Sequence, residues 1–206
     1  MKPREVRPAG AVVLLAAACL LVAACGTSTE PSAAEASPDG VATAGPSAPP
    51  SAAGESPGQS LPAWSTEPLV DVRTGATIRL ADLAGRIVFI EGMATWCPPC
   101  LEQQREAQLA LGRLDQAAVA YVSVDVDPRE AEGTLREYVD RHGFQWSFLV
   151  GSPAFLRELA DSFGSTVLNP PATPIVVLDR AGHGTLTEVG IKRADRLIEL
   201  ARALGA

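Results

Sequence analysis

Short, largely apolar runs alternate with segments of helical spacing between residues 61 and 206. Continuous apolar runs are typical of strands buried on both faces of a sheet, whereas apolar residues at i, i+3, i+4 and i+7 predict amphipathic helices. Strands are therefore expected at residues 86–90, 118–126, 146–150, 175–178 and 185–189. Two shorter apolar stretches flank Thr74-Gly75 and predict a β-hairpin within residues 61–83.

Proline, serine and glycine mark the ends of the predicted helices. Pro98 suits the first turn of a helix that extends to about residue 114, and the next helix ends near Gly143. Ser152 is the N-cap of a third helix, which stops at Gly164. The last helix has one apolar side, made by Leu197, Ile198, Ala201 and Leu204.

Strands that alternate with helices predict an α/β fold with a central mixed β-sheet flanked by helices. The sheet is expected to be mixed because a turn at residues 179–182 joins its last two strands directly. The early hairpin then forms an N-terminal extension. Residues 61–206 are predicted to be one domain.

The first 24 residues have the pattern of a secretory signal peptide. Three basic residues among the first seven precede an apolar run at residues 11–24, which is short for a membrane-spanning helix of ~20 residues. The run ends in Val22-Ala-Ala-Cys25, which resembles the bacterial lipobox, so Cys25 is expected to be lipidated. A plain signal peptide with an incidental cysteine is the alternative.

Residues 25–60 are expected to be the lipidated cysteine followed by a disordered linker. Of residues 26–60, 26 are Ala, Ser, Pro or Gly, and none is basic or aromatic, so the segment cannot bury enough apolar surface to fold.

The whole chain has 24 acidic and 17 basic residues, a formal charge of −7 that disfavours nucleic-acid binding.

Cys97-Pro-Pro-Cys100 is the sharpest chemical signal in the chain. Two cysteines at this spacing can close a disulfide, and the start of a helix favours the thiolate of Cys97. Cys100 is then placed to attack a mixed disulfide on Cys97. Half of a zinc site and a structural disulfide are the alternatives. Zinc would need two further ligands, and a disulfide spanning two residues removes little chain entropy. We therefore expect redox chemistry and no metal.

The segment Met93-Ala-Thr-Trp-Cys-Pro-Pro-Cys100, after an apolar strand, resembles the thioredoxin superfamily, in particular the TlpA/ResA-type extracytoplasmic thiol-disulfide oxidoreductases. The resemblance covers about residues 61–206. It implies a thioredoxin-like fold with a redox-active Cys97–Cys100 disulfide and no other cofactor. The chain departs from that family at Gln103, where a glutamate is usual, and at Met93, where an aromatic is usual. Substrate choice and thiol pKa therefore cannot be carried over from the family.

The same resemblance implies a cis-proline opposite the cysteines. Pro174 is the matching position because it directly precedes the apolar run at residues 175–178, and Thr173 is expected to offer its backbone groups to an extended client chain. Pro170 and Pro171 are rival positions. Client contact is also expected from the residues around the cysteines, Trp96, Pro98 and Pro99.

Glu91 lies at the end of an apolar strand, where thioredoxins have an aspartate beneath the second cysteine. Burial raises the pKa of a carboxyl group, so Glu91 is expected to accept the proton of Cys100. A partly exposed Glu91, or one paired with Lys or Arg, is the alternative.

These features predict a protein disulfide reductase, or less readily an oxidase, held by a lipid anchor on the extracytoplasmic side of the cell membrane. The resemblance implies a membrane thiol donor of the CcdA or DsbD type and protein thiol clients such as apocytochrome c.

The alternative function is that of a copper-binding assembly factor of the SCO type. That family has three residues between its cysteines and a histidine before the late strand, whereas residues 170–174 contain no histidine. A peroxiredoxin-like peroxidase would need Pro and Thr around a single cysteine.

Overall fold

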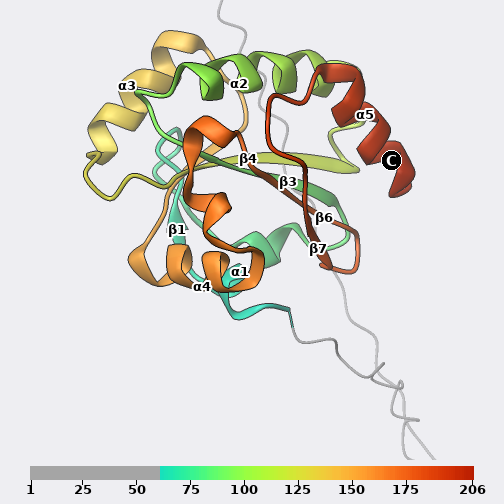
Figure 1. The fold of residues 1–206 in the computed structure, drawn as a ribbon, viewed down its shortest axis with the longest axis horizontal. Helices are drawn as coiled ribbons and strands as arrows, with labels where there is room; N and C mark the ends of the chain where they lie inside the picture. The colour runs from blue at the N-terminus through green and yellow to red at the C-terminus, as the bar shows by residue number, and fades with distance from the viewer. Residues whose placement is uncertain (1–60) are drawn as a thin grey trace, which may run out of the picture. The chain divides into compact units, whose positions relative to one another are not determined.

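The computed structural model describes residues 61–206 (Figure 1). The expected signal peptide at residues 1–24, the lipidated Cys25 and the linker up to residue 60 lie outside the described residues. Among residues 61–206, no helix has the length and apolar character needed to cross a membrane.

Helices and strands alternate along the chain after a short N-terminal hairpin. The α-helices are α1 Ala63–Thr66, α2 Pro98–Leu111, α3 Glu132–His142, α4 Pro153–Phe163 and α5 Ala194–Ala203. The strands are β1 Leu69–Val70, β2 Thr77–Ile78, β3 Ile87–Met93, β4 Val119–Asp125, β5 Ser147–Val150, β6 Ile175–Leu178 and β7 Gly184–Leu186. Three 3-10 helices complete the set: η1 Leu80–Leu83, η2 Ser165–Leu168 and η3 Pro170–Ala172.

The central sheet has the strand order β5-β4-β3-β6-β7. β3, β4 and β5 are parallel, whereas β6 and β7 pair antiparallel, so the predicted mixed sheet is confirmed. The predicted hairpin is also present: β1 and β2 are antiparallel, and Gly75 in the turn has a φ of 71°. An isolated bridge from Asp71 to Leu149 attaches this hairpin to the sheet edge at β5.

Helices cover both faces of the sheet (Figure 1). The helices α2, α3 and α5 pack on one face and bury a first hydrophobic core against it. The helices α1 and α4 pack on the other face and bury a second core. Side chains alternate along a strand, so Ile87 and Phe89 of β3 enter the first core while Val88 and Ile90 enter the second. The same alternation turns Glu91 toward the face that carries α2.

Several predicted boundaries are wrong. α2 ends at Leu111 and not near residue 114, and β7 ends at Leu186 and not at residue 189. β3 continues to Met93, three residues past the expected end, because it pairs with β4 as far as Met93 and with β6 at Glu91. Backbone pairing on both sides therefore keeps Glu91 inside the sheet. At the other end of the chain, α5 ends at Ala203, so Leu204 lies beyond the helix and is 38% exposed.

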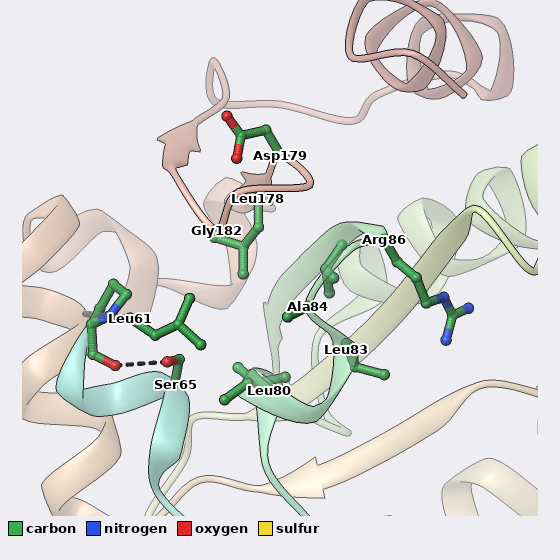
Figure 2. A pocket seen from close by; sticks show the side chains of 12 residues that line it. Leu61, Ser65, Leu80, Leu83, Ala84, Arg86, Leu178, Asp179 and Gly182 are labelled. Atoms are coloured by element: carbon green, nitrogen blue, oxygen red, sulfur yellow. Dashed lines mark hydrogen bonds between the residues drawn. The ribbon is translucent and has the colours of Figure 1, made fainter. Parts of the chain in front are cut away.

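The N-terminal extension closes over one end of the second core. Figure 2 shows the small apolar pocket that remains there between α1, η1 and the turn at Gly182. Its volume is about 10 Å³, close to that of one water probe. Inside it, the Ser65 hydroxyl donates a hydrogen bond to the Pro62 carbonyl oxygen at 2.7 Å. This pocket is too small to hold a cofactor or a client.

Gly92 provides a test of the packing between β3 and η2. A Cβ added at Gly92 would lie 2.4 Å from the Val167 carbonyl oxygen of η2, so Gly92→Ala should lower the free energy of unfolding by about 1–3 kcal/mol or more. Gly133→Ala is the matched control, because an added Cβ there meets no heavy atom within 4 Å. It should leave stability unchanged or raise it by up to about 1 kcal/mol. Urea denaturation measures both, and equal effects would contradict this packing.

Candidate functional site

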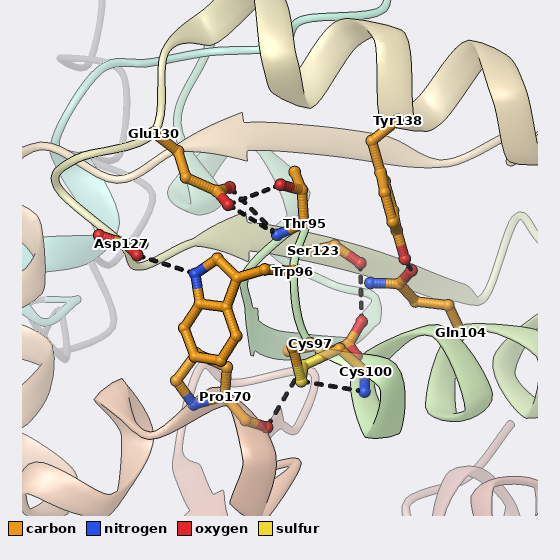
Figure 3. The surroundings of a disulfide bond; sticks show 11 residues. Thr95, Trp96, Cys97, Cys100, Gln104, Ser123, Asp127, Glu130, Tyr138 and Pro170 are labelled. Atoms are coloured by element: carbon orange, nitrogen blue, oxygen red, sulfur yellow. Dashed lines mark hydrogen bonds between the residues drawn. A yellow bond between two sulfur atoms is a disulfide. The ribbon is translucent and has the colours of Figure 1, made fainter.

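The two cysteines form a disulfide at the start of α2 (Figure 3). Cys97 is the N-cap residue, and its sulfur accepts a hydrogen bond from the Cys100 backbone N–H at 3.1 Å. Both cysteines are buried, at 1% and 0% exposure. The unpaired N–H groups and the dipole at this helix end favour a thiolate on Cys97 once the disulfide is reduced.

Two carboxylates hold the loop that precedes Cys97. Glu130 accepts hydrogen bonds from the backbone N–H and the hydroxyl of Thr95, at 3.0 and 2.6 Å. Asp127 accepts one from the indole N–H of Trp96 at 2.8 Å. The Arg129 guanidinium donates to both oxygens of Asp127 and keeps the pKa of that carboxyl well below its usual range. The loop is therefore fixed from the end of β4.

An open groove lies beside the disulfide. Its volume is about 430 Å³ and its walls come from the loop before α2, the end of β4 and the segment around η3. The lining includes Trp96, Val126, Asp127, Leu168, Pro170 and Pro171. Trp96 is 52% exposed although its indole N–H is hydrogen-bonded, so it presents a fixed aromatic surface. Pro98 is exposed and Pro99 is half-buried, and neither lines the groove.

Glu91 is fully buried, at 0% exposure. One carboxylate oxygen accepts a hydrogen bond from the Ser123 hydroxyl at 2.8 Å, and that hydroxyl accepts one from the Trp146 indole at 3.0 Å. The other oxygen, Oε1, has no hydrogen-bond partner. Burial raises the pKa of Glu91 to about 8, although Ser123 and the nearby Gln104 partly oppose this rise. The expected buried position is confirmed, and the alternative of an exposed strand-end residue is wrong.

The expected cis-proline is not present. The Thr173–Pro174 bond is trans, like every other peptide bond in residues 61–206. Thr173 reverses the chain instead by adopting a left-handed conformation, with φ 45° and ψ 51°, at the end of η3. Pro174 is buried at the start of β6.

The backbone groups of Thr173 are also not free for a client chain. Its N–H donates to the Pro170 carbonyl at 2.8 Å, and its carbonyl accepts a hydrogen bond from the Lys192 ammonium. The group that lies against the sulfurs is the Pro170 carbonyl oxygen, 3.3 Å from Cys100 Sγ (Figure 3). The carbonyl of Pro170, a rival to Pro174 in the sequence, therefore contacts the disulfide.

Sequence reasoning missed several buried polar residues around the cysteines. They are Gln103, Gln104, Ser123 and Lys192. In the sequence, Gln103 is notable only because a glutamate is usual there in the TlpA/ResA-type proteins. Lys192 has one usable signal, because it is the only lysine in residues 61–206. Within these residues, no group of three or more His, Cys, Asp and Glu side chains is arranged to hold a metal ion.

Comparison of the sequence with known proteins identifies the family to which the chain belongs. A model of the AhpC/TSA family matches residues 57–181, and the chain belongs to that family. It is 26% identical over 115 residues to the thiol-disulfide oxidoreductase ResA of Halalkalibacterium halodurans. That alignment covers 56% of this chain and 59% of the relative's length.

Solved structures share the fold. A thioredoxin-family thiol:disulfide interchange protein from Chlorobium tepidum has a TM-score of 0.54 at 19% identity, and the match covers 68% of this chain and 97% of that one. A secreted Mycobacterium tuberculosis disulfide oxidoreductase homologous to E. coli DsbE has a TM-score of 0.50 at 20% identity, with the same coverages. The predicted thioredoxin-like α/β fold is thus confirmed.

The burial of Glu91 predicts a specific pH dependence of stability. Below pH 4.5 the carboxyl is protonated in both states, whereas between pH 4.5 and about 8 unfolding releases its proton. The free energy of unfolding should therefore fall as pH rises through this window, by up to about 1.4 kcal/mol per pH unit. Glu91→Gln removes this loss, so the variant should gain stability over the wild type as pH rises.

Urea unfolding at several pH values measures this difference. Burial also raises the pKa of Asp125, to about 7, but Asp125 titrates in both proteins, so their difference isolates Glu91. The exposed Glu137→Gln is the matched control and should follow the wild type. A Glu91→Gln curve parallel to the wild type across the window would show that Glu91 ionises normally in the folded protein.

Proposed function

We propose that this protein is a thiol-disulfide oxidoreductase that acts on protein disulfides through Cys97 and Cys100. The observation that carries the proposal is the disulfide at the N-terminus of α2, flanked by a 430 Å³ groove and accompanied by a buried carboxyl group in the adjacent strand. Similarity to the thiol-disulfide oxidoreductase ResA of Halalkalibacterium halodurans supports the same activity.

The reduced form starts the exchange. The Cys97 thiolate attacks one sulfur of a client disulfide, forms a mixed disulfide, and releases the client's other sulfur as a thiolate. The Cys100 thiol then passes its proton to the Glu91 carboxylate and attacks the Cys97 sulfur. This closes the Cys97–Cys100 disulfide and releases the second client sulfur. Two electrons pass from the protein to the client.

A client chain is proposed to bind in the groove beside Trp96. The exposed indole and the exposed Pro171 offer apolar surface to an extended segment, and the groove is open to solvent. Aromatic groups held by a hydrogen bond at one edge bury large areas with little loss of conformational freedom. The site thus suits a protein segment rather than a small cofactor.

We further propose that the domain works outside the cytoplasm as a reductase, tethered by lipid on Cys25 and by the linker that follows. The basic start, the short apolar run and the cysteine after Ala23-Ala24 support this placement. Electrons would then come from a membrane thiol donor of the CcdA or DsbD type, because regeneration of the dithiol requires a reductant. Apocytochrome c is a proposed client.

Trapping of mixed disulfides tests the roles of the two cysteines. Cys100→Ser should accumulate Cys97-linked adducts with protein clients, because no second thiol remains to resolve them. Cys97→Ser, the matched control, should accumulate none, because it lacks the thiol at the N-cap of α2, where the helix end favours the thiolate. Non-reducing gels followed by peptide mapping identify the linkage. Adducts found mainly on Cys100 would reverse the two roles.

Fractionation of cells tests the anchor. Cys25→Ala should release the protein from the membrane fraction or leave it as an uncleaved precursor, because stable anchoring requires the lipid chains on that cysteine. Cys19→Ala, inside the apolar run, is the matched control and should remain processed and membrane-bound. A Cys25→Ala protein that is cleaved and membrane-bound like the wild type would contradict lipid anchoring.

A further inference from the structure

Lys192 is the only lysine in residues 61–206, and it is 2% exposed. It lies in the loop between β7 and α5. Lysine is almost never fully buried in proteins unless its ammonium is paired. The other basic side chains of the domain, histidines aside, are arginines, and this one enclosed lysine does not serve as a surface charge.

The ammonium of Lys192 donates to three backbone carbonyls. Its Nζ lies 2.5 Å from the Thr173 oxygen, 2.7 Å from that of Gly190 and 2.8 Å from that of Glu188. Three acceptors require three N–H bonds, which only the protonated form has. Burial lowers the pKa of Lys192 to about 8, while Glu188 and Glu91 oppose that change, so the group is charged at neutral pH.

The backbone of Lys192 is held by the helix that carries the cysteines. Gln103 of α2 lies one turn after Cys100 and is fully buried. Its side-chain oxygen accepts from the Lys192 N–H at 2.6 Å, and its side-chain nitrogen donates to the Lys192 carbonyl at 3.0 Å. Both backbone groups of Lys192 are therefore fixed to α2.

These contacts form a ring that leaves α2 at Gln103 and returns to it at Cys100. Gln103 holds Lys192, the Lys192 ammonium holds the Thr173 carbonyl, and the Thr173 N–H donates to the Pro170 carbonyl. The Pro170 carbonyl returns to Cys100 Sγ at 3.3 Å. Pro170 and Pro171 also form a wall of the groove beside Trp96.

We propose that Lys192 is a positioning residue that holds the turn from Pro170 to Thr173 against the disulfide and so fixes one wall of the client groove. The inference rests on the proposed function, because it assigns that groove to the protein client. Lys192 touches neither sulfur, so its effect falls on client docking and not on the attack by Cys97. A compact ammonium suits three converging carbonyls, whereas the planar guanidinium of arginine does not.

Lys192→Met tests the proposal, with Arg193→Met as the matched control. Arg193 is adjacent and also cationic, but its side chain is 74% exposed. Two rates are measured on each full-length protein. The first is the rate at which iodoacetamide alkylates the reduced Cys97. The second is the rate of insulin reduction with dithiothreitol as the electron source, measured over a range of insulin concentrations to give KM. Loss of hydrogen bonds from a charged donor should raise KM for insulin roughly tenfold, while alkylation of Cys97 stays within about twofold of the wild type. Arg193→Met should change neither rate.

Gln103→Leu is the second variant and cuts the same ring while it retains the ammonium. It should also raise KM for insulin and spare alkylation, so it decides the matter if Lys192→Met does not fold. In both variants the Thr173 amide should exchange its hydrogen faster than in the wild type. Parallel loss of alkylation and insulin reduction, or an unchanged KM in a folded variant, would overturn the role of Lys192. A wild-type protein that reduces neither insulin nor oxidised glutathione would instead overturn the proposed function.

Discussion

The burial of one carboxyl group in β3, the strand that leads to the disulfide, is the constraint on which the site depends. Glu91 lies on the central strand of the sheet, hydrogen-bonded on both sides to neighbouring strands and closed off from solvent. A buried carboxylate is costly unless it is paired, and here only one of its oxygens has a partner. Burial therefore keeps the Glu91 carboxyl group protonated and neutral at moderate pH, and it ionises near pH 8.

The polar residues around Glu91 connect that group to the rest of the first core. Ser123 and Trp146 link it to β4 and to the segment before β5. The nearby Gln104 accepts a hydrogen bond from the Tyr138 hydroxyl and so connects α2 to α3. Gln103 and Lys192 link the disulfide helix to the loop before α5 and to the end of η3. Consecutive glutamines, Gln103 and Gln104, thus anchor α2 in two directions. This arrangement explains how a helix that begins with reactive cysteines is held without covalent bonds to its neighbours.

The sequence predicted the layered α/β fold, the hairpin and most strands, because apolar runs and helix-capping residues act locally. Ser152 does cap α4, and Gly143 does end α3 in a left-handed conformation. The motif around Cys97 and Cys100 was equally readable. The prediction stopped β3 at residue 90 because Glu91 breaks the apolar run, whereas cross-strand pairing from both sides extends it. Thr173 and Lys192 lie far from the cysteines in sequence, and only tertiary structure brings them together. No local pattern indicates a left-handed threonine before a trans-proline.

The pH dependence of mixed-disulfide resolution tests the central claim, that Glu91 accepts the proton of Cys100. In a single turnover with oxidised glutathione, followed by rapid quenching, the attack by Cys97 and the later release by Cys100 are separate steps. The account predicts that the release rate of the wild type rises with an apparent pKa near 8, the value to which burial raises the pKa of Glu91. It also predicts that Glu91→Gln slows release by about 10²-fold or more, as expected for loss of a general base, and leaves the first attack intact. Identical release rates in the two proteins from pH 6 to pH 9 would contradict the account.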